Sequence, residues 1–490
     1  MTRAAPILLL LALGCGKDPP RDDRMPSTED SGPSTDDSAA PFGDNLTALG
    51  AAPESGFPPE LTGVLTREDG WVFACAGTTP MLVYDARNPG SPARVAQLNF
   101  PLNSGGFRCQ HLSFAGGDRL LATHHGDETS PPWIGLADIS DPASPLGLSS
   151  WSDGRTALSG VVVDGDTAFV AARQDGVLVF ELSTGVLNNP DTLPNVTGNA
   201  VSVALRGDTL AVGTLEGEVQ LLSTRGEPLA KIPVSGAAYD LVWLDDDALV
   251  VAVGAGGLDR LSVSGGAITA HADTYSPALD LAALGDGALA VAAWSEILVF
   301  DPETLTLLGA ENPAGAGQEA VVLALDALGD TLYVGDWQTL LTYRWDPTVS
   351  APDLALDVFN VDFGAAPPGE AVAAAVVLRN RGPKALELTG ISVSDPALSV
   401  DRATLTIPAY GADFVELSWV STGMELRAEL VLTSADPDEG ELRLDVYANR
   451  PGISVGQRLP SFSYLSINDG QIYDSQSLGA PALLSYFATF

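Results

Sequence analysis

Residues 278–301, ALDLAALGDGALAVAAWSEILVFD, contain three apolar runs, with a Gly-Asp-Gly turn between the first and the second. The runs are short and are bounded by turn residues, which favours strands over helices. Gly and Asp tolerate the positive φ angles of a tight hairpin turn, so the first two runs are expected to pair. The stretch therefore predicts an antiparallel sheet of consecutive strands.

The same pattern occurs seven times between Val64 and Trp345. Its turn aspartates follow one another at intervals of 49, 48, 42, 38, 40 and 44 residues, close to the length of a four-stranded propeller blade. They are Asp69, Asp118, Asp166, Asp208, Asp246, Asp286 and Asp330. A single sheet cannot bury both of its faces, so the repeats are expected to pack side by side in a ring. We therefore predict an all-β fold with a seven-bladed β-propeller at residues 45–350.

The seventh repeat lacks an outer strand, because the chain continues into PTVSAP at 347–352. Before the first repeat, LTALGAAPESG at 46–56 is similar to LTLLGAENPAG at 305–315, the expected outer strand of the sixth repeat. We therefore predict that residues 46–50 pair with the seventh blade and close the ring from both chain ends.

Two segments, PMLVYDARNPGSPARVAQL (80–98) and GLADISDPASPLG (135–147), resemble the LVIVD-repeat family of bacterial surface propellers. The matching positions are Asp85, Asn88, Pro89, Pro92, Asp138, Asp141, Pro142 and Pro145. The later repeats keep only the pattern of strand, Gly-Asp turn and strand. This resemblance implies a propeller at the cell surface and adds little about chemistry.

Residues 1–14 combine one arginine with the apolar run AAPILLLLALG, which is typical of an export signal and too short to span a bilayer. The sequence LALGC resembles the lipobox of bacterial lipoproteins, with Ala12 where leucine is usual. The resemblance implies cleavage before Cys15 and lipid attachment there. The alternative is an ordinary signal peptide with an incidental cysteine. Residues 15–44 are rich in Pro, Ser and Asp and are expected to form a disordered tether.

These N-terminal features predict a lipid-anchored protein of the cell envelope. Gly16 stands where a retention signal such as Asp would follow the lipidated cysteine, so by analogy with well-studied bacteria the outer membrane is expected. Export also implies an oxidising compartment. Cys75 and Cys109 then form either a structural disulfide or two buried free thiols.

The charge balance excludes one class of partner. The chain has 63 Asp and Glu against 24 Lys and Arg, a net charge of -39, so no cationic stripe is available for nucleic acid. The acids are spread along the chain, which indicates a solvated surface, with an acidic docking site as the alternative.

The candidate metal ligands lie in the second repeat. If Phe114 pairs with Arg119, His111 and His124 share a face of the blade and form a weak candidate metal site. The alternative is that these histidines lie at strand ends and bond to loop backbone. No Gly-x-Ser-x-Gly motif, phosphate-binding loop or Cys-x-x-Cys occurs, so neither a catalytic residue nor a cofactor is predicted.

Aromatic residues provide a second candidate surface. Four tryptophans fall at the expected ends of blade strands, where they either line a ligand surface or pack in the blade cores. They are Trp133, Trp243, Trp294 and Trp337.

Residues 351–449 have a different pattern of strands and turns. They resemble the immunoglobulin-like domains named for abnormal-spindle protein and hydin, at Phe363-Gly364, LRNRG (378–382), ALELTGI (385–391), and Pro408 with Gly411. This resemblance implies a β-sandwich that acts as a spacer or docking module.

Residues 450–490 resemble the beginning of thioredoxin-like redoxins, at Gly456, Leu459-Pro460, Phe462, Asp469-Gly470 and 477–479. In that family the strand corresponding to the last residues here leads to a reactive cysteine at a helix N-terminus. The sequence reaches Phe490 before such a cysteine, so we expect a short incomplete thioredoxin-like segment. The alternative is a tail with accidental similarity.

Together these features predict a non-enzymatic envelope lipoprotein that binds or scaffolds an unknown protein or glycan. The membrane is a partner only through the lipid anchor. The first alternative is an envelope thiol-disulfide protein whose catalytic part is missing from this chain. The second is a propeller hydrolase or lyase that uses the histidines of the second repeat.

Overall fold

The computed structural model describes residues 45–53, 60–77, 81–101, 109–126, 131–154, 156–274, 276–313, 320–337, 339–356, 358, 360–437 and 440–450. It also describes the backbone of two paired strands, β38 (Ser463–Leu465) and β39 (Ile472–Asp474). The predicted signal peptide and tether, and most of the thioredoxin-like segment, lie outside the described residues. Within the described part all regular elements are strands, and none of it forms a helix that could cross a membrane.

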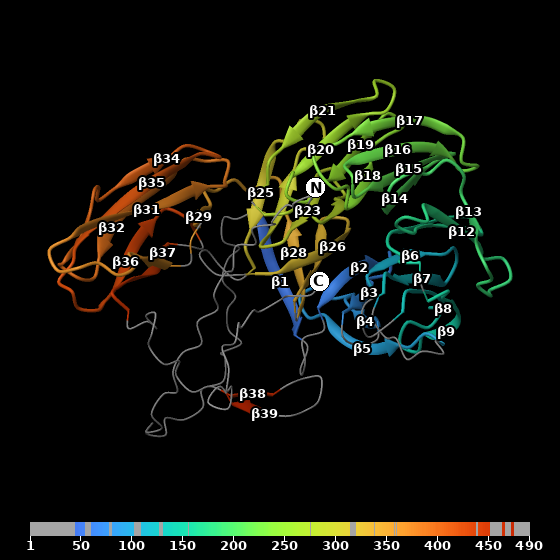
Figure 1. Ribbon diagram of the computed structural model, residues 1–490, viewed down its shortest axis with the longest axis horizontal. Helices are drawn as coiled ribbons and strands as arrows, with labels where there is room; N and C mark the ends of the chain where they lie inside the picture. Colours follow the sequence, from blue (N-terminus) through green and yellow to red (C-terminus); the bar gives the residue numbers. More distant parts are fainter. Residues whose placement is uncertain are drawn as a thin grey trace, which may run out of the picture. The chain divides into compact units, whose positions relative to one another are not determined.

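Among the described residues, seven antiparallel four-stranded sheets form the blades of a propeller, and six of these seven are built from consecutive strands (Figure 1). The strands of blades one to three are β2 (Leu61–Thr66), β3 (Trp71–Ala76), β4 (Met81–Asp85), β5 (Ala93–Leu98), β6 (His111–Phe114), β7 (Arg119–His124), β8 (Trp133–Asp138), β9 (Leu146–Trp151), β10 (Val161–Asp164), β11 (Thr167–Ala171), β12 (Val177–Glu181) and β13 (Asp191–Thr192).

Blades four to seven continue this order. Their strands are β14 (Ala200–Arg206), β15 (Thr209–Thr214), β16 (Glu218–Ser223), β17 (Pro228–Pro233), β18 (Asp240–Trp243), β19 (Ala248–Ala252), β20 (Leu258–Ser262), β21 (Ala267–Ala272), β22 (Asp280–Ala283), β23 (Leu289–Ala293), β24 (Glu296–Phe300), β25 (Leu307–Glu311), β26 (Val322–Leu328), β27 (Thr331–Asp336), β28 (Thr339–Trp345) and β1 (Leu46–Pro53).

The blades form a closed ring. The first strand of each blade contacts the first strand of the next, and β26 of blade seven contacts β2 of blade one. Seven clusters of buried apolar side chains lie within the described ring, one at each junction between neighbouring blades. Apolar burial at about 25 cal/mol per Å² therefore holds each sheet to both of its neighbours. The prediction of an all-β propeller with seven repeats is confirmed.

The ring is closed by the N-terminal strand. β1 pairs antiparallel with β28, from Leu46 opposite Trp345 to Pro53 opposite Thr339. Figure 1 shows the blue β1 beside the gold β28. Leu46 is buried among Tyr343, Trp345 and apolar residues of blade six. The predicted pairing of residues 46–50 with the seventh blade is confirmed, and the strand extends further than predicted.

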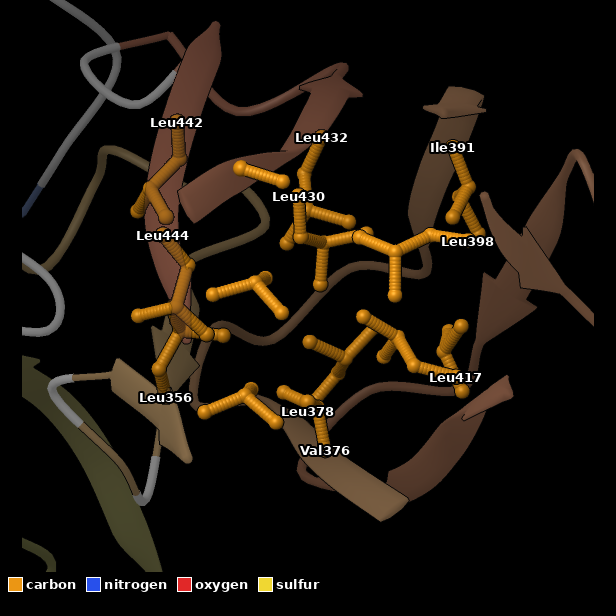
Figure 2. Packing of buried hydrophobic residues seen from close by; sticks show 14 of the residues in the cluster. Leu356, Val376, Leu378, Ile391, Leu398, Leu417, Leu430, Leu432, Leu442 and Leu444 are labelled. Carbon is orange, nitrogen blue, oxygen red and sulfur yellow. The ribbon is translucent and has the colours of Figure 1, made fainter. Parts of the chain in front are cut away.

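The remaining described strands form two sheets around one core. One sheet has the order β29 (Leu354–Leu356), β31 (Ala371–Asn380), β35 (Ala412–Val420) and β33 (Leu398–Val400). The other has the order β30 (Asn360–Asp362), β37 (Glu441–Ala448), β36 (Leu426–Ser434), β32 (Leu386–Val393) and β34 (Leu405–Ile407). Leucines from both sheets meet between them, among them Leu378, Leu417, Leu430 and Leu444 (Figure 2). This part of the chain is thus a two-sheet sandwich with its own core.

Candidate functional site: the central channel of the ring

The centre of the ring contains a cavity of about 260 Å³ that is lined by all seven blades. It lies among the first strands and the residues that precede them. Its polar side chains are those of Thr62, Gln110, His111, Ser202, Tyr239, Asp240 and Asp280. The cavity is smaller than the ~300–1,000 Å³ of sites for drug-sized ligands. It therefore has room for a small molecule, or for one residue of a larger one.

Two carboxyl groups form one side of this cavity. Asp240 accepts a hydrogen bond from the backbone N–H of Leu281 on the next blade (3.0 Å), and Asp280 accepts one from that of Leu325 (3.0 Å). The two carboxyls also hydrogen-bond to each other. Because the backbone of the following blade anchors each carboxyl, the pair is held rigidly in the channel wall.

The surroundings of this pair favour its protonated form. Burial raises the pKa of Asp240 to about 6. Burial, followed by the charge of Asp240, raises the pKa of Asp280 well above its usual value. Two neighbouring buried carboxylates cannot both ionise cheaply, so the pair shares a proton near neutral pH.

A third aspartate, Asp326, also accepts hydrogen bonds from the following blade. Asp326 of blade seven accepts hydrogen bonds from the backbone N–H and the side-chain hydroxyl of Thr66 in blade one, at 2.6 and 2.8 Å. Burial raises its pKa as well. A series of carboxyls therefore connects blades five, six, seven and one around the channel.

His111 lies on another part of the channel wall. Burial, followed by the charges of His125 and Arg173, lowers the pKa of His111 to about 4, so its imidazole is neutral at pH 7. Arg173 follows β11 with a positive φ of 52° and is half-buried. Its guanidinium interacts electrostatically with His111 of blade two and with Tyr239 of blade five.

The register of blade two separates the predicted metal ligands. The hairpin pairs Phe114 with Leu120 and His111 with Thr123, one residue away from the register that would put both histidines on one face. The reason is the turn, in which Gly116 and Gly117 both have positive φ and Ala115 bonds to Arg119.

His111 therefore lines the channel, whereas His124 is buried on the other face of the sheet, with its ring 5.5 Å from that of His125 and 6.3 Å from that of Trp133. No group of three or more potential metal ligands occurs in the described part of the chain.

The structure also places the predicted cysteine pair and the four tryptophans. Cys75 and Cys109 are joined by a disulfide, with their Cα atoms 5.0 Å apart, between blades one and two. Trp133 is buried and packs 5.0 Å from Phe100, so it belongs to a blade core. Cys15 lies outside the described residues. The remaining tryptophans, Trp243, Trp294 and Trp337, are half-buried.

Sequence reasoning did not single out the aspartates of the channel. The available signal was their recurrence: Asp240 and Asp280 each begin an inner strand, and each precedes its turn aspartate, Asp246 or Asp286, by the same spacing. An acid repeated at one position of otherwise apolar strands indicates that the carboxyl group has a hydrogen-bond partner within the fold. Its pairing with a neighbour becomes visible only when the blades stand side by side.

Comparisons with known proteins support the architecture alone. No protein-family model matches the chain, and no curated protein matches it. Among solved structures, the WD40 β-propeller domain of Doa1 aligns with a TM-score of 0.50 and 10% identity, over 61% of this chain and 97% of that one. This part of the chain is a β-propeller. A computationally designed protein, Ika8, aligns with a TM-score of 0.45 and 13% identity, over 61% of this chain and 99% of the designed one.

Proposed function

We propose that the protein is a non-enzymatic cell-envelope lipoprotein that binds a protein or glycan at the central channel of its propeller. The observation that carries this proposal is the cavity itself, to which every blade contributes and in which polar side chains converge. Such a concave site on a rigid scaffold is typical of ligand recognition. The β-propeller fold is consistent with a binding or scaffolding role.

The location is proposed from the sequence. The lipobox-like LALGC segment supports attachment of lipid at Cys15, and residues 16–44 form the tether in this proposal. The LVIVD-like repeats support a place in the envelope, with the outer membrane as the favoured site. The two-sheet sandwich acts as the immunoglobulin-like spacer or docking module.

Binding is tested with the full chain in detergent, immobilised and exposed to fractionated protein and glycan extracts of the envelope. The variant Asp280→Asn changes the lining of the channel, and Asp175→Asn is its matched control, because Asp175 is exposed on a loop of blade three. We expect the wild type and the control to retain the same material and Asp280→Asn to lose most of it. Equal retention by all three proteins, or retention of nothing above background, would refute binding at the channel.

Lipid attachment is tested separately by labelling cells with radioactive palmitate. The wild type is expected to incorporate label and to fractionate with membranes, whereas Cys15→Ser is expected to incorporate none and to leave the membrane fraction. Identical labelling and fractionation of the two proteins would contradict the proposed anchor.

A further inference from the structure

Building on the proposed function, we infer that the channel opening on the face of the hairpin turns docks a basic peptide segment of another protein. One apolar side chain of that segment enters a groove between blades three, four and five. Lys or Arg residues on either side of it meet the exposed aspartates of the turns. The inference rests on the lining of the groove and on the charges around it.

The groove is an extension of the central channel. It is lined by residues of β10, β14 and β18 and by the turns that follow β14 and β18, and it has a volume of about 670 Å³. Val161 and Val203 line both this groove and the cavity at the centre of the ring. A partner held here therefore occupies one opening of the channel to which the proposed function assigns binding.

The walls of the groove are largely apolar and reach the solvent. Leu205, Val242 and Trp243 line it and are half-buried, so each keeps part of its apolar surface in contact with water. Covering this surface with an apolar side chain is favourable, and one anchor residue in such a groove supplies much of the affinity of a protein contact. The groove therefore favours leucine or an aromatic residue as the anchor.

The turns around the groove are acidic. In every blade a hairpin turn follows the first strand, and the aspartate of each of these turns is exposed. Asp164, Asp245 and Asp247 add exposed carboxyl groups in the turns of blades three and five. Ion pairs between turns of neighbouring blades, such as that of Arg119 with Asp166, place these turns on one face of the ring.

The basic side chains of these turns are already paired. Arg67, Arg119 and Arg206 each form an ion pair with a turn aspartate, with N–O distances of 2.7, 2.9 and 2.8 Å. The described turns and the residues that flank them contain no further Lys or Arg. The other carboxylates therefore give the rim of the groove a negative potential, which attracts cations and repels anions.

Charge decides which kind of partner fits the groove. A second copy of this chain has a net charge of -39 and is repelled, as are nucleic acids and anionic lipid surfaces. An uncharged glycan gains nothing from the charge of the carboxylates. A peptide with an apolar residue between Lys or Arg residues fits both the groove and its rim.

The experiment is fluorescence anisotropy of the full chain in detergent with three labelled nonapeptides. The first has a central phenylalanine flanked by four lysines in a glycine background, the second has glycine in place of the phenylalanine, and the third has glutamates in place of the lysines. We expect the first peptide to bind at least tenfold more tightly than either of the others. Raising the salt concentration from about 50 to about 500 mM is expected to weaken its binding at least tenfold, because salt screens the charges.

Two charge variants locate the basic part of the peptide. Asp164→Asn/Asp208→Asn removes two exposed carboxylates from turns next to the groove. Asp175→Asn/Asp191→Asn removes two exposed carboxylates elsewhere on blade three and is the matched control. We expect the first variant to weaken binding of the phenylalanine peptide at least fivefold and the control to leave it unchanged.

Two leucine variants locate the anchor. Leu205→Ser changes the wall of the groove, and Leu215→Ser is its control, because Leu215 is exposed on a turn of the same blade. We expect Leu205→Ser to bind the phenylalanine peptide at least fivefold more weakly and the control to bind it normally. Circular dichroism and thermal unfolding identify a variant that fails to fold, and the peptide comparison and the charge variants then decide the question.

The inference is overturned if no peptide binds, or if the glycine or the glutamate peptide binds as tightly as the first. It is also overturned if the control substitutions weaken binding as much as those at the groove. Retention of envelope material that depends on Asp280 would in that case leave the proposed function standing and show that only the class of partner is wrong.

Discussion

At the scale of single residues, Asp240 makes the stability of the ring depend on pH. Its pKa is about 6 in the folded protein and near 3.9 in an unfolded chain, so the folded state binds more protons between these values. Its contribution to stability is therefore complete below pH 4 and is lost as pH rises through 6. We predict that Asp240→Asn increases the free energy of unfolding by about 3 kcal/mol at pH 7.5 relative to wild type, and by only about 1 kcal/mol at pH 4.5. Urea unfolding at the two pH values measures this difference, and an equal effect at both would contradict it.

His111 acts in the opposite direction within an overlapping pH range. Its folded-state pKa of about 4 lies below the ordinary value of 6.5, so the unfolded chain binds the extra proton between them. Stability is therefore lost as pH falls through this interval. We predict that His111→Gln is more stable at pH 5 than at pH 7, relative to wild type. Urea unfolding of the two proteins at both values checks the sign, and Asp240→Asn serves as the variant with the opposite trend.

The disulfide between Cys75 and Cys109 connects blades one and two covalently. The two residues are 34 positions apart, and closing a loop of that length is worth about 2–4 kcal/mol. We predict this loss of stability in the Cys75→Ala/Cys109→Ala protein and in reduced wild type. Chemical unfolding with and without reductant measures it, and a double variant that remains sensitive to reductant would be the contrary result.

The sequence was sufficient to suggest a disulfide between Cys75 and Cys109 as one of two alternatives, because few cysteines were available. It was insufficient to predict whether His111 and His124 share a face of the blade. A single residue in the turn at Gly116 and Gly117 decides the register, and a change of one position moves His124 to the other face.

At the scale of elements, β1 determines whether the ring closes. Leu46 is 2% exposed and packs among buried residues of blades six and seven. We predict that Leu46→Ala lowers the free energy of unfolding by about 3 kcal/mol, because it leaves a cavity at the last junction. Ala51→Ser is the control, since Ala51 lies on the same strand and is exposed. Equilibrium unfolding of both variants decides the matter: similar stabilities would show that the junction does not depend on β1.

The existence and order of the strands were predictable because each hairpin carries its own turn residues and apolar runs. The role of β1 was predictable from its similarity to β25 and from the missing outer strand. The three aspartates that accept backbone N–H groups from the next blade were not predictable, because no local pattern states which strand will face them.

At the scale of the whole molecule, the propeller and the sandwich have separate cores. In the sandwich, buried Asn380 donates to the carbonyls of Lys384, Ile407 and Pro408, and accepts from two backbone N–H groups. We predict two transitions in calorimetry of the full chain. Asn380→Ala is expected to lower the temperature of only one of them, because it leaves several buried groups unsatisfied and so reduces the free energy of unfolding of the sandwich by about 3 kcal/mol.

Ser399→Ala is the control for that experiment, because Ser399 is exposed on the same sandwich. Leu46→Ala is expected to shift only the other transition. A single transition that both buried substitutions shift equally would show that the two parts unfold as one.

The division into propeller and sandwich was predictable from the change in pattern near residue 350, since the repeats end there. The ligand chemistry was not, because it depends on side chains contributed by all seven blades to one small space.

The pairing of β1 with β28 also determines when, during synthesis of the chain, the ring can close. The ribosome makes β1 before every other strand of the ring and makes β28 last, so a nascent chain contains all the intervening blades before the final junction can form. Closure of the ring is therefore delayed until the last strand of the propeller has been synthesised.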